Sequence, residues 1–172
     1  EWITGLSIAS VWHMKRAVCP GSFDPITYGH LDIIERAAQQ FDHVVVAVLE
    51  NRTKSSLFTV AERIAMITEV TTRFPNVSVD SWSGLLVDYC RSNSIQAIVK
   101  GLRAVTDFDY ELQMAQVNLQ GSGVETMFMA TSPVHSFLSS SLVKELAHYN
   151  GDVSTMVPPS INEALKARVA GK

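Results

Sequence analysis

The sequence predicts a single α/β domain with a doubly wound, five-stranded parallel sheet, and three observations support this fold class. Short β-branched runs alternate with amphipathic stretches from residue 15 onward. The run His43–Leu49 is apolar almost throughout, as in a central strand that is covered on both faces. The chain has 172 residues, 47% of them hydrophobic, which suits one sizeable core. Short connections between alternating strands and helices imply right-handed βαβ units and a Rossmann-like architecture.

Each element is predicted from its local pattern. The expected strands are Arg16–Cys19, His43–Leu49, Val77–Ser81, Ala97–Val99 and Thr126–Ala130. The expected helices are His30–Phe41, Val60–Phe74, Leu85–Asn93, Asp107–Leu119, Ser141–Tyr149 and Ile161–Val169. Thr59 and Glu62 have the spacing of a capping box, which marks a helix start. Asn150-Gly151 suits a helix C-terminus.

The first thirteen residues differ from the rest of the chain. They carry no Lys or Arg ahead of an apolar region, so they do not resemble a secretory signal. Met14-Lys15-Arg16 looks like a natural start that leads into a strand. We therefore expect residues 1–13 to be an added or upstream-translated extension and residues 14–172 to form the domain.

Composition argues against several classes of protein. The formal net charge is −3 and no Lys/Arg block exceeds two residues, so nucleic acid is not an expected partner. The longest aliphatic run, Val44–Leu49, is too short to cross a membrane. Cys19 and Cys90 form no C-x-x-C pair and are expected to be reduced, as in the cytoplasm. The five histidines include no pair at helical ligand spacing, which disfavours a zinc site.

The loop after the first strand, CPGSFDPITYGH (residues 19–30), is the first candidate for chemistry, because ligands of such sheets gather at the carboxyl ends of strands. Gly21 allows a ligand close to the backbone, and Ser22 supplies a hydroxyl. Gly29-His30 stands at a helix start, where free N–H groups favour phosphate. His30 can donate a hydrogen bond to phosphate, more strongly when protonated. The alternative is a tight turn with a capping histidine, since the loop matches neither the dinucleotide fingerprint nor a P-loop.

Three further loops follow strands at the same end of the sheet. ENRTKSSLF carries Lys54, a candidate site cation that could instead be an ordinary solvated charge in a loop. KGLRAVTDFDYE brings Lys100, Arg103 and Glu111, although its acidic residues could simply serve a helix dipole. HSFLSSSLVKE opens a helix with three serines, for which N-capping is a sufficient explanation. Together the loops offer cations, hydroxyls and backbone donors without an obvious nucleophile–base pair, which favours phosphoryl or nucleotidyl transfer.

Three stretches resemble a known family. PGSFDPITYGH resembles the T/H-x-G-H signature of the nucleotidyltransferase superfamily, and SFLSSSLVKE resembles its serine-rich second signature. With KGLRAVTDFDYELQMAQVN between them, the resemblance narrows to bacterial phosphopantetheine adenylyltransferases and extends from Met14 to about Ala170. It implies the dinucleotide-binding-type nucleotidyltransferase fold. It also implies direct in-line transfer of the adenylyl group of ATP to 4′-phosphopantetheine, without a covalent intermediate. The products would be dephospho-coenzyme A and pyrophosphate, the penultimate step of coenzyme A biosynthesis.

The resemblance also implies roles for individual residues. The catalytic set would be His30, Lys54 and Arg103, with His30 stabilising the transition state at the α-phosphate. ATP would contact Ser22, Phe23, His30, Gly101, Leu102, Arg103, Glu111, His135, Ser136, Phe137, Leu138, Ser139, Ser140 and Ser141. The substrate 4′-phosphopantetheine would contact Ser22, Lys54, Leu86 and Lys100. Ser22 stands where threonine is frequent in the family, and Lys100 where some members have arginine.

The cofactor and partners follow from the same resemblance. Mg²⁺ is expected to arrive with ATP, because the sequence shows no dedicated carboxylate cage. A cytoplasmic homohexamer and feedback binding of coenzyme A are implied by the family alone.

Two rival functions remain open at this point. One is a nucleotidyltransferase of the same fold with a different acceptor, such as nicotinate mononucleotide or glycerol 3-phosphate, against which GLRAVTDFDYE argues. The other is a non-catalytic adenine-nucleotide sensor, against which the presence of His30, Lys54 and the three serines argues.

Overall fold

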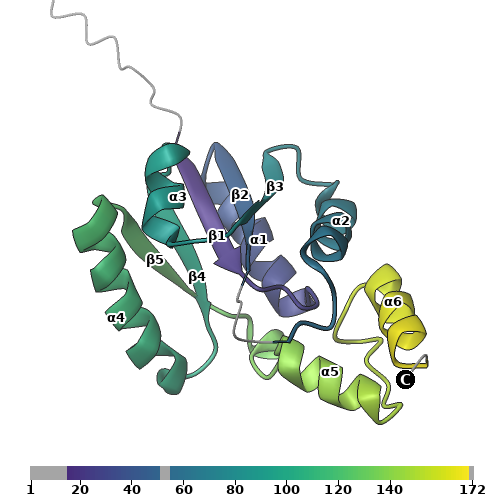
Figure 1. The fold of residues 1–172 in the computed structure, drawn as a ribbon. Helices are drawn as coiled ribbons and strands as arrows, with labels where there is room; N and C mark the ends of the chain where they lie inside the picture. Colours follow the sequence, from purple (N-terminus) through teal and green to yellow (C-terminus); the bar gives the residue numbers. More distant parts are fainter. Residues whose placement is uncertain (1–14, 51–54, 171–172) are drawn as a thin grey trace, which may run out of the picture.

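The structure is a computed structural model that describes residues 15–50 and 55–170 (Figure 1). The predictions for residues 1–13 and for Lys54 therefore lie outside the described residues. No helix in the described ranges is both long and apolar enough to cross a membrane.

Five strands form one parallel sheet in the order β3-β2-β1-β4-β5 (Figure 1). They are β1 (Arg16–Gly21), β2 (His43–Leu49), β3 (Val77–Trp82), β4 (Ala97–Leu102) and β5 (Glu125–Ala130). The predicted fold class is thus confirmed. The strand β4 is longer than predicted, because its pairing with β5 continues as far as Leu102↔Ala130. Lys100, Gly101 and Leu102 therefore belong to a strand end and not to the loop after it.

Six α-helices and one 3₁₀ turn connect the strands and complete the described chain. They are α1 (Tyr28–Gln40), α2 (Val60–Thr71), α3 (Leu86–Ser92), α4 (Val105–Ser122), α5 (Ser140–His148), α6 (Pro159–Ala170) and the 3₁₀ turn Pro133–His135. The capping box of Thr59 and Glu62 is present at the start of α2. The helix α4 is longer than predicted and ends at Gly123, whose positive φ of 72° suits glycine. Beyond α5 it is Asn150, not Gly151, that takes the left-handed conformation.

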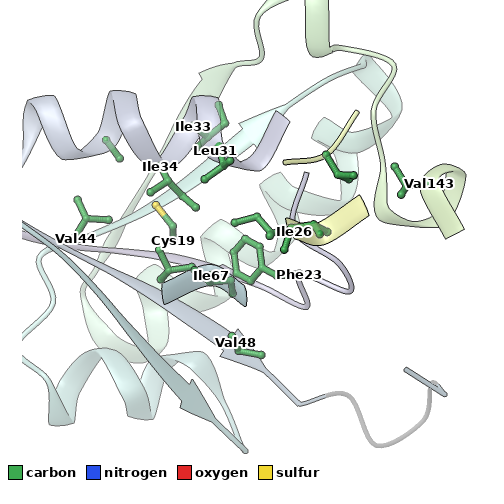
Figure 2. Packing of buried hydrophobic residues seen from close by; sticks show 14 of the residues in the cluster. Cys19, Phe23, Ile26, Leu31, Ile33, Ile34, Val44, Val48, Ile67 and Val143 are labelled. Carbon is green, nitrogen blue, oxygen red and sulfur yellow. The ribbon is translucent and has the colours of Figure 1, made fainter. Parts of the chain in front are cut away.

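Helices cover both faces of the sheet. On one face, Ala17, Cys19, Val44 and other alternate strand residues pack against α1, α2, α5 and α6 in the larger core cluster, part of which Figure 2 shows. On the other face, Val18 and its neighbours pack against α3 in a smaller cluster. This alternation is the period of two that a strand imposes on its side chains. It explains why β2, which contributes side chains to both clusters, is apolar almost throughout.

The strand order reverses direction next to β1. The chain proceeds from β1 outward through β2 and β3, and then returns to place β4 on the other side of β1. The connections that leave β1 and β4 diverge, and the crevice between them is where open α/β sheets bind ligands. Gly101 lets β4 approach α1 here, because an added Cβ would lie only 2.8 Å from Cγ1 of Ile33.

Candidate active site

A cavity of about 460 Å³ opens at this reversal of strand order. Its volume is in the usual range for small-molecule sites. Its walls come from the loop after β1, the end of β4, the first turns of α4 and the segment 135–141. The cavity brings together most of the residues predicted to bind substrates: Ser22, Phe23, His30, Lys100, Gly101, Arg103, Glu111, His135, Leu138, Ser139, Ser140 and Ser141.

Four other predicted residues do not line this cavity: Leu86, Leu102, Ser136 and Phe137. The side chain of Leu86 packs against the smaller core cluster, and that of Ser136 donates a hydrogen bond to the carbonyl of Pro133. Phe137 is 59% exposed at the surface. Contacts of these four residues with a ligand stay predictions, as does the contact of Lys54.

His30 occupies the third position of α1 and completes its capping box. The hydroxyl of Thr27 accepts from the backbone N–H of His30 at 3.4 Å, and the backbone N–H of Thr27 donates to Nδ1 of His30 at 3.0 Å. A backbone N–H can only donate, so Nδ1 is the unprotonated nitrogen and the neutral imidazole carries its proton on Nε2. The predicted capping role and the predicted phosphate-donor role are therefore compatible, because they use different ring nitrogens.

The imidazole of His30 is neutral at physiological pH. Burial against the cavity wall and, second, the positive charge of Arg103 lower its pKa to about 4. The ring of Phe23 meets it edge to face, with centroids 5.2 Å apart, and contributes apolar surroundings. The sequence-based expectation that a protonated His30 would bind phosphate more strongly stays a prediction; without ligand the ring is neutral, and Nε2–H is the donor that it can offer.

Two cations stand on the side of the cavity formed by β4 and α4. The Nζ of Lys100 lies 3.3 Å from a carboxylate oxygen of Glu111. The guanidinium of Arg103 pairs with Asp107, with Nε 3.1 Å from Oδ2, and its Nη1 donates to the carbonyl of Leu138 at 3.0 Å. The first-turn Asp107 is thus an ion-pair partner as well as a residue that suits the helix dipole.

The comparison with known proteins decides the family. The chain is 57% identical over 157 residues to phosphopantetheine adenylyltransferase of Thermobifida fusca (91% of this chain and 96% of the relative). It is 60% identical over 159 residues to that of Streptomyces coelicolor (92% and 100%), and 61% identical over 161 residues to that of Frankia casuarinae (91% and 99%). The chain belongs to the phosphopantetheine adenylyltransferase family.

Two further matches are broader, one to a family model and one to a fold. Residues 18–146 match the family described as cytidylyltransferase-like. The fold is shared with the crystal structure of a putative nicotinate-nucleotide adenylyltransferase from Vibrio parahaemolyticus. That match has a TM-score of 0.57 at 18% identity and covers 90% of this chain and 99% of the other. The chain is therefore an enzyme of the nucleotidyltransferase class.

Two of the serines at the start of α5 make structural contacts in this phosphopantetheine adenylyltransferase family member. Ser139 is the N-cap of α5, and its hydroxyl accepts from the backbone N–H of Leu142 at 3.1 Å. The hydroxyl of Ser140 donates to the carbonyl of Pro25 at 2.8 Å and so ties α5 to the loop after β1. The predicted N-capping alternative is confirmed for Ser139. The helix N-terminus remains part of the cavity wall, where its partial positive charge suits phosphate.

Both cysteines are free and buried, as predicted. Cys19 lines the cavity, but burial raises the pKa of its thiol to about 12. The thiolate is the nucleophilic form, so Cys19 is not a nucleophile at neutral pH.

Sequence reasoning missed Asp24, which holds the loop after β1 in place. Its carboxylate, 4% exposed, accepts from the backbone N–H groups of Leu57 at 2.9 Å and Phe58 at 2.8 Å, and from Nζ of Lys144 at 2.8 Å. Burial alone would favour the neutral acid, but the hydrogen bonds from Lys144 and the two amides outweigh it and lower the pKa of Asp24. Its partners lie 33 to 120 positions away in sequence, so no local pattern could have revealed them.

Proposed function

We propose that this protein transfers the adenylyl group of ATP to the phosphate of 4′-phosphopantetheine, giving dephospho-coenzyme A and pyrophosphate in the penultimate step of coenzyme A biosynthesis. Family membership supports the reaction. The structural observation that carries it is the cavity at the strand-order reversal, where His30, Lys100, Arg103 and the N-terminus of α5 meet. Such a set suits two phosphorylated substrates more than any single neutral one.

In the proposed mechanism the acceptor phosphate attacks the α-phosphorus of ATP directly. A new P–O bond forms to the acceptor oxygen while the bond to the pyrophosphate leaving group breaks on the opposite side, with no covalent intermediate on the protein. The nucleophile is already an anion, so no general base is required. Catalysis then depends on holding two polyanions in line and on stabilising charge in the transition state.

His30 suits the second of these tasks. Its Nδ1 is occupied by the backbone of Thr27, so the ring orientation is fixed before substrate binds. Its Nε2–H would donate to an α-phosphate oxygen as charge builds there. Lys100 and Arg103 would offset the substrate charge by exchanging their contacts with Glu111 and Asp107 for contacts with phosphate oxygens. Lys54 would hold the acceptor phosphate.

Mg²⁺ would enter with ATP and not as a resident ion. The carboxylates of the cavity, Asp107 and Glu111, are already paired with Arg103 and Lys100, so this donor set does not form a cage for a cation. Magnesium keeps several waters and binds phosphate oxygens readily, which suits an ion carried on the triphosphate. Its contribution there would be to neutralise triphosphate charge.

The assembly we propose is a cytoplasmic homohexamer with feedback binding of coenzyme A. Apolar side chains on α4 and on the edge strand β5 support self-association, since Val117 is 57% and Met127 51% exposed. Coenzyme A contains the phosphopantetheine arm of the acceptor and would compete for the same cavity.

The test is pyrophosphate release from Mg-ATP with and without 4′-phosphopantetheine. We expect release only with the acceptor. His30→Ala should lower kcat about 10²–10³-fold, because its contact strengthens in the transition state, and should change ATP affinity about twofold or less. His148→Ala, on α5 outside the cavity lining, is the matched control and should behave as wild type.

Two other outcomes would reject this function. ATP binding with no release for 4′-phosphopantetheine, but release for nicotinate mononucleotide or glycerol 3-phosphate, would assign another acceptor. ATP binding with no release for any of the three would favour the sensor.

A further inference from the structure

The loop after β1 turns sharply at Phe23, where the backbone is strained. The φ of Phe23 is 47°, in the left-handed region that a bulky aromatic residue rarely adopts. The residue is 4% exposed and belongs to the larger core cluster (Figure 2). Its ring lies against Gly21, where an added Cβ would stand 3.0 Å from it. A strained backbone of this kind persists only where the surrounding groups hold it in place.

One of the groups that hold it is Arg63, the fourth residue of α2. Its Nη1 donates to the carbonyl of Ser22 at 2.6 Å, and its Nε donates to the carbonyl of Thr59 at 3.4 Å. The carbonyl of Ser22 belongs to the peptide that joins Ser22 to Phe23, and the φ of Phe23 describes the rotation of that peptide. The contact from Arg63 therefore fixes the group on which the conformation of Phe23 depends.

Arg63 makes this contact from a position that is unfavourable for a charge. The residue is 3% exposed, and within residues 15–50 and 55–170 no carboxylate pairs with it. Burying a cation without a partner costs free energy, and apolar side chains of similar volume often replace buried charges without loss of stability. Packing alone therefore gives no reason for an arginine here, whereas holding a carbonyl of the cavity loop does.

The loop is also held just after Phe23, by a different set of groups. The carboxylate of Asp24 accepts from two backbone N–H groups and from Nζ of Lys144, as described above. These contacts act on a side chain that follows Phe23, while Arg63 acts on the peptide that precedes it. Phe23 is thus held between two anchored points, and α2 supplies the first of them.

The ring of Phe23 contacts the imidazole of His30 inside the cavity. The two rings meet edge to face with centroids 5.2 Å apart, and both residues line the cavity. The backbone N–H of Thr27 orients the imidazole through Nδ1, and the ring of Phe23 packs beside it. If Phe23 moved, His30 would be less buried and less firmly placed.

We propose that Arg63 is a positioning residue for His30: it holds the carbonyl of Ser22 and thereby keeps Phe23 in the conformation that packs its ring against the imidazole. The contacts run from α2, where Arg63 lies outside the cavity lining, through the loop after β1 to the first turn of α1. The effect on catalysis rests on the proposed function, because it needs His30 to act in adenylyl transfer. The effect on the surroundings of His30 does not.

The first measurement is the pKa of His30, by NMR titration of the histidine rings in the full chain, with His30→Gln to assign the signal. Arg63→Met should raise this pKa from about 4 toward the ordinary 6.5, because a displaced Phe23 would expose the imidazole to water. Burial and then Arg103 set the pKa of His30, and Arg63 is not among these causes. A rise would therefore report movement of Phe23 and not the loss of a charge.

The second measurement is pyrophosphate release. Arg63→Met should lower kcat about 10–100-fold, the effect of a misplaced catalytic group, and should change the KM for ATP less than about threefold. Arg63→Lys keeps one donor and should recover part of both changes. In a Phe23→Ala background, Arg63→Met should lower kcat less than about twofold further, because the ring that it positions is gone. Arg73→Met, just beyond α2 with an exposed partner in Glu35, is the control and should match wild type.

A merely structural role would give a different pattern. An unchanged titration of His30 in folded Arg63→Met would overturn the proposal, and so would equal fold-losses of kcat in the wild-type and Phe23→Ala backgrounds. Thermal unfolding identifies an Arg63→Met protein that fails to fold, in which case Arg63→Lys decides by the same criteria. Wild-type protein that releases no pyrophosphate with 4′-phosphopantetheine would overturn the proposed function, while the titration of His30 would still decide this inference.

Discussion

Acid is expected to destabilise this protein through His30, at a pH well above the range in which most carboxylates titrate. The pKa of His30 falls from its ordinary 6.5 to about 4 on folding, because of burial and the charge of Arg103. The unfolded chain therefore binds this proton more readily than the folded protein. Stability is fully present above about pH 6.5 and is lost as the pH falls from there toward 4. With these two pKa values, linkage gives a loss of up to about 2 kcal/mol at pH 5.

The assay is urea unfolding of wild type and His30→Gln at a series of pH values between 7.5 and 5. Glutamine cannot titrate, so the free energy of unfolding of the variant should fall less steeply with acidification. The pKa of His43 is also lowered, by burial and then by Arg16, but His43 is common to both proteins and its contribution cancels in the comparison. Parallel pH dependences for the two proteins would refute the depressed pKa, and with it the argument that His30 acts as a neutral donor.

Two further predictions concern the framework of the cavity. Gly101→Ala should lower the free energy of unfolding by about 1–3 kcal/mol, because the new Cβ would lie 2.8 Å from Cγ1 of Ile33. In an Ile33→Ala background, urea unfolding should show that this loss vanishes. An equal loss in both backgrounds would contradict the contact. Asp24→Asn should lower the free energy of unfolding by about 3 kcal/mol, since it leaves Lys144 without its counter-charge. The exposed control Asp152→Asn should unfold as wild type does, and similar losses in the two variants would show that burial of Asp24 does not matter.

The parts of the fold that the sequence predicted well are those that depend on local periodicity. The strand His43–Leu49 has the predicted bounds, because apolar residues on both faces leave few alternatives. The helix start at Thr59 followed from a spacing that matters only within one turn. The extension of β4 through Lys100 to Leu102 could not be read in this way. It depends on pairing with β5, and the polar and glycine residues there do not favour a strand by themselves.

The candidate site shows the same division between local and distant information. The residues Ser22, His30 and Arg103 could be placed at one edge of the sheet because parallel strands bring their following loops together. The protonation state of His30 could not be predicted from the sequence. Its tautomer depends on the backbone N–H of Thr27, and its pKa depends on burial and on Arg103. Another contact that the sequence could not reveal is the hydrogen bond from Arg168 to the carbonyl of Leu57, because the two residues are 111 positions apart.

The charges of the cavity explain why a neutral histidine suits this chemistry. Lys100 and Arg103 are each balanced by a carboxylate, so the cavity without ligand carries little net charge from these four groups. A protonated His30 would add an unbalanced positive charge at a half-buried position, which its low pKa shows to be unfavourable. Under the proposed function, a bound triphosphate would let the two cations exchange carboxylate oxygens for phosphate oxygens. The imidazole, which its Nδ1 contact with Thr27 already orients, would then offer Nε2–H to a phosphate oxygen. In the proposed mechanism, His30 would therefore start as a neutral Nε2–H donor when substrate arrives.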